Sequence, residues 1–273
     1  RSLVCVREHH PPGGGPADVV NELVQFSVPA SGPSEPSVVV HGPDFVSDPR
    51  WRPDGGALCW LEWDHPNMPW DGTRLMVRIG DGAAALVAGG PDESVFQPRW
   101  HADGSLWFTD PSYGIDSDYE GHRADSEIGA CHVYRLDPAS GALQVIADDF
   151  ERPNGLAFSA DERQLYISGS RRKHIRVFAV TGASAITSGQ VFATCDAGTF
   201  DGIRLDASGR IWAAAADGLH CFDPDGTLIG KLHVPEVVAN FTFGGAKRNH
   251  LFICASSSLY SILVNFNGAR YPR

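Results

Sequence analysis

Apolar residues along the chain fall into many short runs that polar turn residues separate. Three such runs, SLVCV, ELVQFSV and SVVVHG, occur within the first 42 residues alone. Segments of ten or more residues with a helical period are missing, so a fold that alternates strands and helices is disfavoured. The pattern predicts an all-β protein of short antiparallel strands joined by tight turns.

One longer pattern recurs five times: a short strand, an Asp-Gly-like turn and a second apolar strand. The copies are SDPRWRPDGGALCW from Ser47, FQPRWHADGSLWF from Phe96, NGLAFSADERQLYI from Asn154, DGIRLDASGRIWA from Asp201 and ANFTFGGAKRNHLFI from Ala239. Their starts are 49, 58, 47 and 38 residues apart, which is the length of a four-stranded propeller blade. A third strand with its own turn follows in VYRLDPASG (133–141) and HCFDPDG (220–226).

The repeat predicts a six-bladed β-propeller with about four antiparallel strands per blade. The residues before Ser47 would form the sixth blade. We expect the C-terminal run SLYSILVNFNGAR (258–270) to complete that blade and close the ring, because closure removes free sheet edges. No linker divides the chain, so residues 1–273 are predicted to form a single propeller domain, with an ordinary blade entrance near residues 94–107.

Composition and charge narrow the function. The net charge is −11 with a pI of about 5.4, which disfavours binding to nucleic acid. No apolar run is long enough to span a membrane, and the N-terminus lacks the features of a signal peptide, so a cytoplasmic setting is expected. The protein is also expected to be a monomer. The 6 cysteines are scattered singly, and we interpret them as reduced and buried.

The second part of the chain carries four motifs in a specific order. They are LWFTDPSYG (106–114), ERPNGLAFSADERQLYISGS (151–170), DGIRLDASGRIWAA (201–214) and VANFTFGG (238–245). Through them, residues 105–273 resemble the gluconolactonase and senescence-marker-protein family of six-bladed propellers. The resemblance implies a hydrolase of lactones or esters that depends on a divalent metal ion, usually calcium.

Residues 1–104 carry different motifs, namely VVNELVQFSV (19–28), WDHPNMPWDG (63–72) and AGGPDESVFQPRW (88–100). They resemble the propeller domain of prolyl-oligopeptidase-like and acylaminoacyl-peptidase-like serine peptidases. In that family the propeller screens substrates for a hydrolase domain, and this chain has no GxSxG nucleophile elbow. We interpret the chain as a chimera, recombined or engineered, of two half-propellers. A natural lactonase with a diverged N-terminal part is the alternative.

The gluconolactonase resemblance implies a channel site of one Glu, two Asn and one Asp at the starts of innermost strands. The repeat alignment places these positions at Ser47, Phe96, Asn154 and Asp201, and only the last two keep the family residue. Asn154 and Asp201 are therefore the expected metal ligands, and Asp201 is also the candidate catalytic base or nucleophile. The metal site is half present, so calcium binding is expected to be weak or lost.

Three neighbouring residues are candidate additions to this site. Asp48 lies one residue from the Glu position, although strand alternation would point its side chain away from the channel. Asp110 and Asn240 are expected near the channel mouth, with Asp110 as a turn residue of the TDPSYG loop.

Two functions stay open at this point. The first is a weak or inactive lactonase that takes a small lactone or ester. The second is a non-enzymatic propeller that serves as a scaffold or a binding module, which the missing Glu and Asn favour. A substrate gate for a peptidase is a third and weaker reading, because it needs a hydrolase partner.

Overall fold

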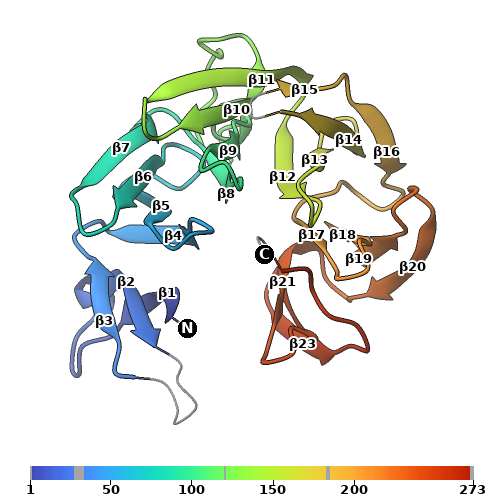
Figure 1. The fold of residues 1–273 in the computed structure, drawn as a ribbon. Helices are drawn as coiled ribbons and strands as arrows, with labels where there is room; N and C mark the ends of the chain where they lie inside the picture. Colours follow the sequence, from blue (N-terminus) through green and yellow to red (C-terminus); the bar gives the residue numbers. More distant parts are fainter. Residues whose placement is uncertain (1, 28–33, 120, 183–184, 271–273) are drawn as a thin grey trace.

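The computed structural model describes residues 2–27, 34–119, 121–182 and 185–270. Its strands form six sheets arranged around a central axis, as Figure 1 shows. In each sheet, neighbouring strands pair antiparallel, and the first strand lies innermost. The prediction of an all-β, six-bladed propeller is confirmed.

The first three blades take up the chain as far as Phe150. Blade one contains β1 (Ser2–His9), β2 (Val20–Ser27) and β3 (Ser37–Val40), with the 3-10 helix η1 (Pro16–Asp18) between β1 and β2. Blade two contains β4 (Phe45–Trp51), β5 (Ala57–Trp63), β6 (Arg74–Ile79) and β7 (Ala84–Gly89). Blade three contains β8 (Phe96–Trp100), β9 (Leu106–Thr109), α1 (Tyr113–Asp116), β10 (Cys131–Asp137) and β11 (Ala142–Phe150).

The remaining chain forms blades four to six. Blade four contains β12 (Pro153–Phe158), β13 (Gln164–Gly169), β14 (His174–Thr181), β15 (Ala185–Ile186) and β16 (Gln190–Thr194). Blade five contains β17 (Ile203–Leu205), β18 (Ile211–Ala215), β19 (Gly218–Phe222) and β20 (Leu228–His233). Blade six contains β21 (Val238–Gly244), β22 (His250–Ala255) and β23 (Leu259–Leu263).

The five repeat copies become the first two strands of blades two to six. In four of the five blades the first residue of the copy lies in the innermost strand, and in blade five Asp201 lies two residues before β17. The turn connects the innermost strand to a buried second strand such as β18, whose five residues are all buried. This follows from the sequence, because an apolar run without alternation suits a strand that is covered on both faces.

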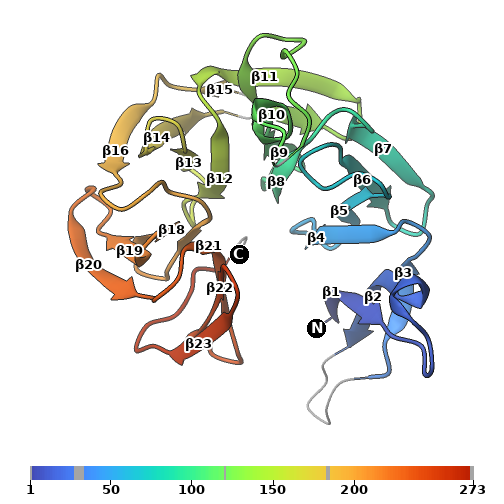
Figure 2. The same cartoon turned by 180° about the vertical axis from the view of Figure 1, so that it is seen from behind.

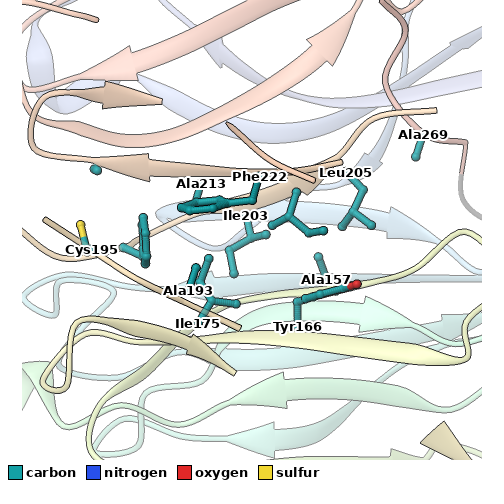
Figure 3. Close-up of a cluster of buried hydrophobic side chains, with 13 residues drawn as sticks. Ala157, Tyr166, Ile175, Ala193, Cys195, Ile203, Leu205, Ala213, Phe222 and Ala269 are labelled. Atoms are coloured by element: carbon teal, nitrogen blue, oxygen red, sulfur yellow. The ribbon is translucent and has the colours of Figure 1, made fainter. Parts of the chain in front are cut away.

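Hydrophobic clusters between neighbouring blades form the core. In Figure 3, residues of blade four such as Tyr166 and Ile175 pack against Ile203, Leu205 and Phe222 of blade five. The predicted entrance near residues 94–107 is packed in the same way, since Trp100, Leu106 and Phe108 lie buried in the cluster between blades two and three. That prediction is confirmed, and the entrance is no linker.

The predicted ring closure is wrong. β23 pairs with β22 of its own blade, and among the described residues no strand pairing joins blade one to blade six. The following segment turns inward to blade five, where the amide of Ala269 donates to the carbonyl of Leu205 at 3.0 Å and Gly268 bridges to Asp206. Gly268 and Ala269 are thus held against blade five, and Figure 2 shows blade six and blade one as separate sheets.

The six cysteines are free in the structure. Cys59, Cys195 and Cys221 are buried as expected, but Cys254 is exposed and Cys5 and Cys131 are half-buried, so the expectation of burial is wrong for these three. Cys254 lies on β22 of blade six. Within the described ranges, no helix has the length and hydropathy to cross a membrane.

Candidate functional site

Asn154 and Asp201 lie at equivalent positions of two adjacent blades. Asn154 is the second residue of β12, and Asp201 comes just before β17, which contacts β12. The Asn154 side chain hydrogen-bonds the Asp201 carboxylate, and both residues are half-buried. The structure therefore brings the two sequence-predicted site residues together.

Burial controls the ionisation of Asp201. It raises the pKa of this carboxyl to about 6, although the Asn154 hydrogen bond and the charge of Arg204 act in the opposite direction. A carboxyl with such a pKa loses its proton near neutral pH. It can therefore accept a proton at one stage of a reaction and return it at another.

Two buried hydroxyls position the backbone of the pair. The Thr109 hydroxyl of blade three donates to the carbonyl of Asn154 at 3.1 Å, and the Ser168 hydroxyl of blade four donates to the carbonyl of Asp201 at 3.0 Å. Each comes from the second strand of the preceding blade. Gly155 permits this approach, because a Cβ there would lie 2.3 Å from the Asp201 carbonyl oxygen.

Tyr113 and Ser170 complete the site and were missed at the sequence level. The Asn154 amide donates to the Tyr113 hydroxyl at 3.0 Å, and that hydroxyl donates to Ser170 Oγ at 2.7 Å. Burial raises the pKa of Tyr113. Tyr113 lies in the motif LWFTDPSYG, and Ser170 lies in ERPNGLAFSADERQLYISGS together with Asn154. Membership of these motifs was the signal in the sequence that could have pointed to both residues.

The other two aligned positions offer little to a cation. Ser47 presents a neutral hydroxyl, 3.5 Å from Asp48 Oδ2, and Phe96 has no polar side-chain atom. A β-bulge between Ser47 and Arg50 breaks the alternation that was expected to turn Asp48 away. Asp48 nevertheless forms an ion pair of 3.2 Å with Arg50, so its charge is already partly compensated.

The expected neighbours of the site lie in different surroundings. Asn240 of β21 packs against Gly202, where a Cβ would lie 2.4 Å from its Oδ1, and so it adjoins Asp201. Asp110 instead lines a cavity of about 560 Å³ between blades two and three, together with Glu93, Phe108 and Tyr134. Burial and the nearby Glu93 raise the pKa of Asp110 to about 6. Neither Asn154 nor Asp201 lines this cavity.

A second group of possible metal ligands lies on blade five. Asp196, Asp217 and His220 have ligand atoms within 4.8 Å of one another. However, the Lys231 ammonium contacts Asp196 at 2.6 Å and Asp217 at 3.0 Å, so a fixed positive charge already occupies the position of a cation.

The donor set of the channel does not fit a four-ligand calcium cage. Of the four aligned positions, Asn154 and Asp201 supply an amide and a carboxylate, Ser47 supplies a hydroxyl and Phe96 supplies nothing. Calcium takes six to eight oxygen ligands, usually with several carboxylates. A single carboxylate and one amide would leave most of the coordination to water.

Comparison with known proteins assigns the family. The profile described as "SMP-30/Gluconolactonase/LRE-like region" matches residues 97–257, which is more than half of the chain. The chain belongs to this family. A gluconolactonase of Zymomonas mobilis subsp. mobilis is 33% identical over 224 residues, which cover 78% of this chain and 59% of the relative. The match is longer than residues 105–273, so likeness to a gluconolactonase extends into the first hundred residues.

Solved structures agree with the fold. A gluconolactonase of Xanthomonas campestris superposes with a TM-score of 0.66 and 28% identity, over 90% of this chain and 81% of that chain. A puromycin hydrolase superposes with a TM-score of 0.60 over 92% of this chain and 40% of that chain, at 22% identity, which concerns the fold alone. The chain spans about half the length of the curated relatives that it matches, from 59% down to 43%. The chimera stays a prediction.

Proposed function

We propose that the channel mouth binds a small lactone and hydrolyses it weakly, with Asp201 as the general base. The observation that carries the proposal is the pair of Asn154 and Asp201 on adjacent innermost strands, with the pKa of Asp201 raised to about 6. Family membership supports the reaction type. The match to a gluconolactonase supports a lactone as the substrate class.

The chain's own residues can be given roles without a metal ion. Above pH 6 the Asp201 carboxylate accepts a proton from a water molecule as its oxygen bonds to the lactone carbonyl carbon. The ring C–O bond then breaks, and Asp201 returns the proton to the leaving alkoxide. Asn154, held by Tyr113, orients the carboxylate. These roles place no positive charge beside the carbonyl oxygen, which becomes negative as water attacks. The acceleration of lactone hydrolysis by these residues is therefore expected to be small.

The proposal is tested by following hydrolysis of D-glucono-δ-lactone at pH 7 against the spontaneous reaction. We expect a small enzymatic rate that Asp201→Ala removes. Asp110→Asn is the matched control, because Asp110 has a similar raised pKa but lies in a separate cavity. A rate that survives Asp201→Ala would overturn the role of Asp201. Complete absence of a rate would favour the non-enzymatic binding module.

A divalent ion, calcium first, is expected to bind weakly through Asn154 and Asp201. The double variant Ser47→Glu and Phe96→Asn should raise calcium affinity about tenfold or more, because it adds an anionic and a neutral oxygen donor at the two deficient positions. Calorimetric titration with calcium measures both proteins, and Asp201→Ala in the double variant should abolish the gain. Tight binding by the unmodified chain, or no gain in a folded double variant, would contradict this. The cytoplasmic setting and the monomeric state stay predictions.

A further inference from the structure

Three arginines occupy the same place on three innermost strands. Arg50 of β4, Arg99 of β8 and Arg204 of β17 each come three residues after the start of their repeat copy. The next residues, Trp51, Trp100 and Leu205, pack into hydrophobic clusters. Since side chains alternate along a strand, the arginines leave from the opposite face.

The three guanidiniums adopt the same local geometry. In each, Nη1 donates to the carbonyl of the preceding residue: Arg50 to Pro49 at 3.5 Å, Arg99 to Pro98 at 2.8 Å and Arg204 to Ile203 at 2.7 Å. This contact folds each guanidinium back along its own strand. The repeated arrangement indicates a layer built by the fold, and we call Arg50, Arg99 and Arg204 the arginine layer.

The members of the arginine layer influence one another electrostatically from three blades. Blades three and five, which carry Arg99 and Arg204, have blade four between them, and β4, β8 and β17 all face the central axis in Figure 1. Burial lowers the pKa of Arg99 well below its usual range, and the charges of Arg50 and Arg204 lower it further. Positive charges on three blades therefore act on one another within a protein whose net charge is −11.

Compensation within the layer is incomplete. Arg50 pairs with Asp48 at 3.2 Å, and the charge of Arg204 acts on Asp201. Arg99, the central member, donates to two neutral oxygens, Gln97 Oε1 at 3.0 Å and the Pro98 carbonyl. The carboxylate whose charge favours its ionised form is Asp48, which already pairs with Arg50. Like charges that are gathered away from bulk water are costly without a counter-charge. A planar guanidinium also matches the geometry of carboxylate and phosphate oxygens.

We propose that the arginine layer is a binding site for a small oxyanion, a phosphate or carboxylate group, in the central channel. Arg204 comes three residues after Asp201 along the chain, at most roughly 10 Å of extended backbone. The anion is either free in solution or the acidic end of a lactone whose ring lies at Asp201. The second source rests on the proposed function, whereas the anion site itself does not.

The test is a calorimetric titration of the full chain with inorganic phosphate. We expect saturable binding that Arg99→Gln weakens about tenfold or more, because charge-assisted hydrogen bonds to an anion are lost. Arg204→Lys keeps the charge but loses the planar fork, and should weaken binding several-fold. Arg172→Gln is the control, since Arg172 forms an exposed ion pair with Glu151 and does not belong to the arginine layer. It should leave the affinity unchanged.

Thermal melting separates a binding role from a structural one. In phosphate-free buffer, Arg99→Gln should keep or raise the Tm, because it removes repulsion, and phosphate should no longer raise the Tm. A lower Tm with phosphate stabilisation retained would overturn the proposal. So would absence of saturable phosphate binding by the unmodified chain, or equal losses in Arg99→Gln and Arg172→Gln.

A second titration distinguishes the two sources of the anion. If the anion is part of the substrate, D-gluconate 6-phosphate should bind more tightly than inorganic phosphate. Asp201→Ala should then lower the affinity for D-gluconate 6-phosphate and leave the affinity for inorganic phosphate unchanged. If the anion is free, the two ligands should bind equally. Both results support the anion site. Phosphate binding is measured without turnover. The test of the anion site therefore stays valid even if the protein does not hydrolyse lactones.

Discussion

At the scale of single residues, the burial of Asp201 links the site to stability. Its folded-state pKa of about 6 lies above the ordinary value of 3.8 for an aspartate, so the folded protein holds this proton more tightly than the unfolded chain. The penalty for burying the carboxylate is nearly absent below the unfolded pKa of 3.8, grows as the pH rises from there to about 6, and is complete above pH 6. Burial of the ionised Asp201 carboxyl therefore lowers the free energy of unfolding at neutral pH.

Asp201→Asn should therefore raise the free energy of unfolding by about 2–3 kcal/mol at pH 8, and by less than about 1 kcal/mol at pH 4. Urea denaturation at both pH values measures this difference. Asp149→Asn provides a control of opposite sign, since the hydrogen bond from Arg176 lowers the pKa of Asp149. It should reduce stability at pH 8. An equal gain for Asp201→Asn at both pH values would contradict the assignment.

At the scale of elements, the close approach of β12 to β17 depends on Gly155. A Cβ at this position would lie 2.3 Å from the carbonyl oxygen of Asp201 and 3.0 Å from the amide of Ile203. Both are backbone atoms of an innermost strand that buried neighbours hold in place. The contact between the two strands therefore sets the position of Asp201.

Gly155→Ala should destabilise the protein by about 1–3 kcal/mol, because the two strands must move apart. It should also reduce lactone hydrolysis. Gly230→Ala in β20 is the matched control: no atom lies within 4 Å of the added Cβ, and a change of under about 0.5 kcal/mol is expected. Chemical denaturation of both variants gives the comparison. A neutral Gly155→Ala would show that the strands are not in tight contact.

At the scale of the whole molecule, blades one and six are three-stranded. Within the described ranges no strand pairs with the outer edge of β23, and Leu259 and Leu263 on it are 69% and 70% exposed. An exposed apolar edge strand is a template for pairing with another chain.

Leu263→Lys should slow aggregation several-fold while leaving the Tm nearly unchanged, because a charge on an edge strand opposes pairing and little buried surface is lost. Light scattering during incubation at a fixed temperature measures the rate. Tyr119→Lys adds the same charge at a residue that is 93% exposed and outside any strand. Equal slowing by both variants would assign the effect to net charge and not to the edge.

The amino-acid sequence by itself determined the blades and the register of the channel residues. Strand pattern and repeat are local, so Ser47, Phe96, Asn154 and Asp201 could be aligned without knowledge of the fold. The same periodicity predicted that residues 94–107 form a packed blade entrance, and Trp100 and Phe108 do lie buried there in one cluster.

Only the tertiary structure decided which distant groups meet. The hydrogen bond between Tyr113 and Asn154 joins residues on different blades, and the electrostatic effect of Arg204 on Arg99 acts across the channel. The sequence pattern could not predict which blade the C-terminal strand joins, because the apolar run Leu259–Leu263 suits blade one or blade six equally well. In the structure this strand belongs to blade six, and the segment after it contacts blade five through the hydrogen bond from Ala269 to Leu205. A repeat specifies each sheet, whereas packing between blades specifies the site.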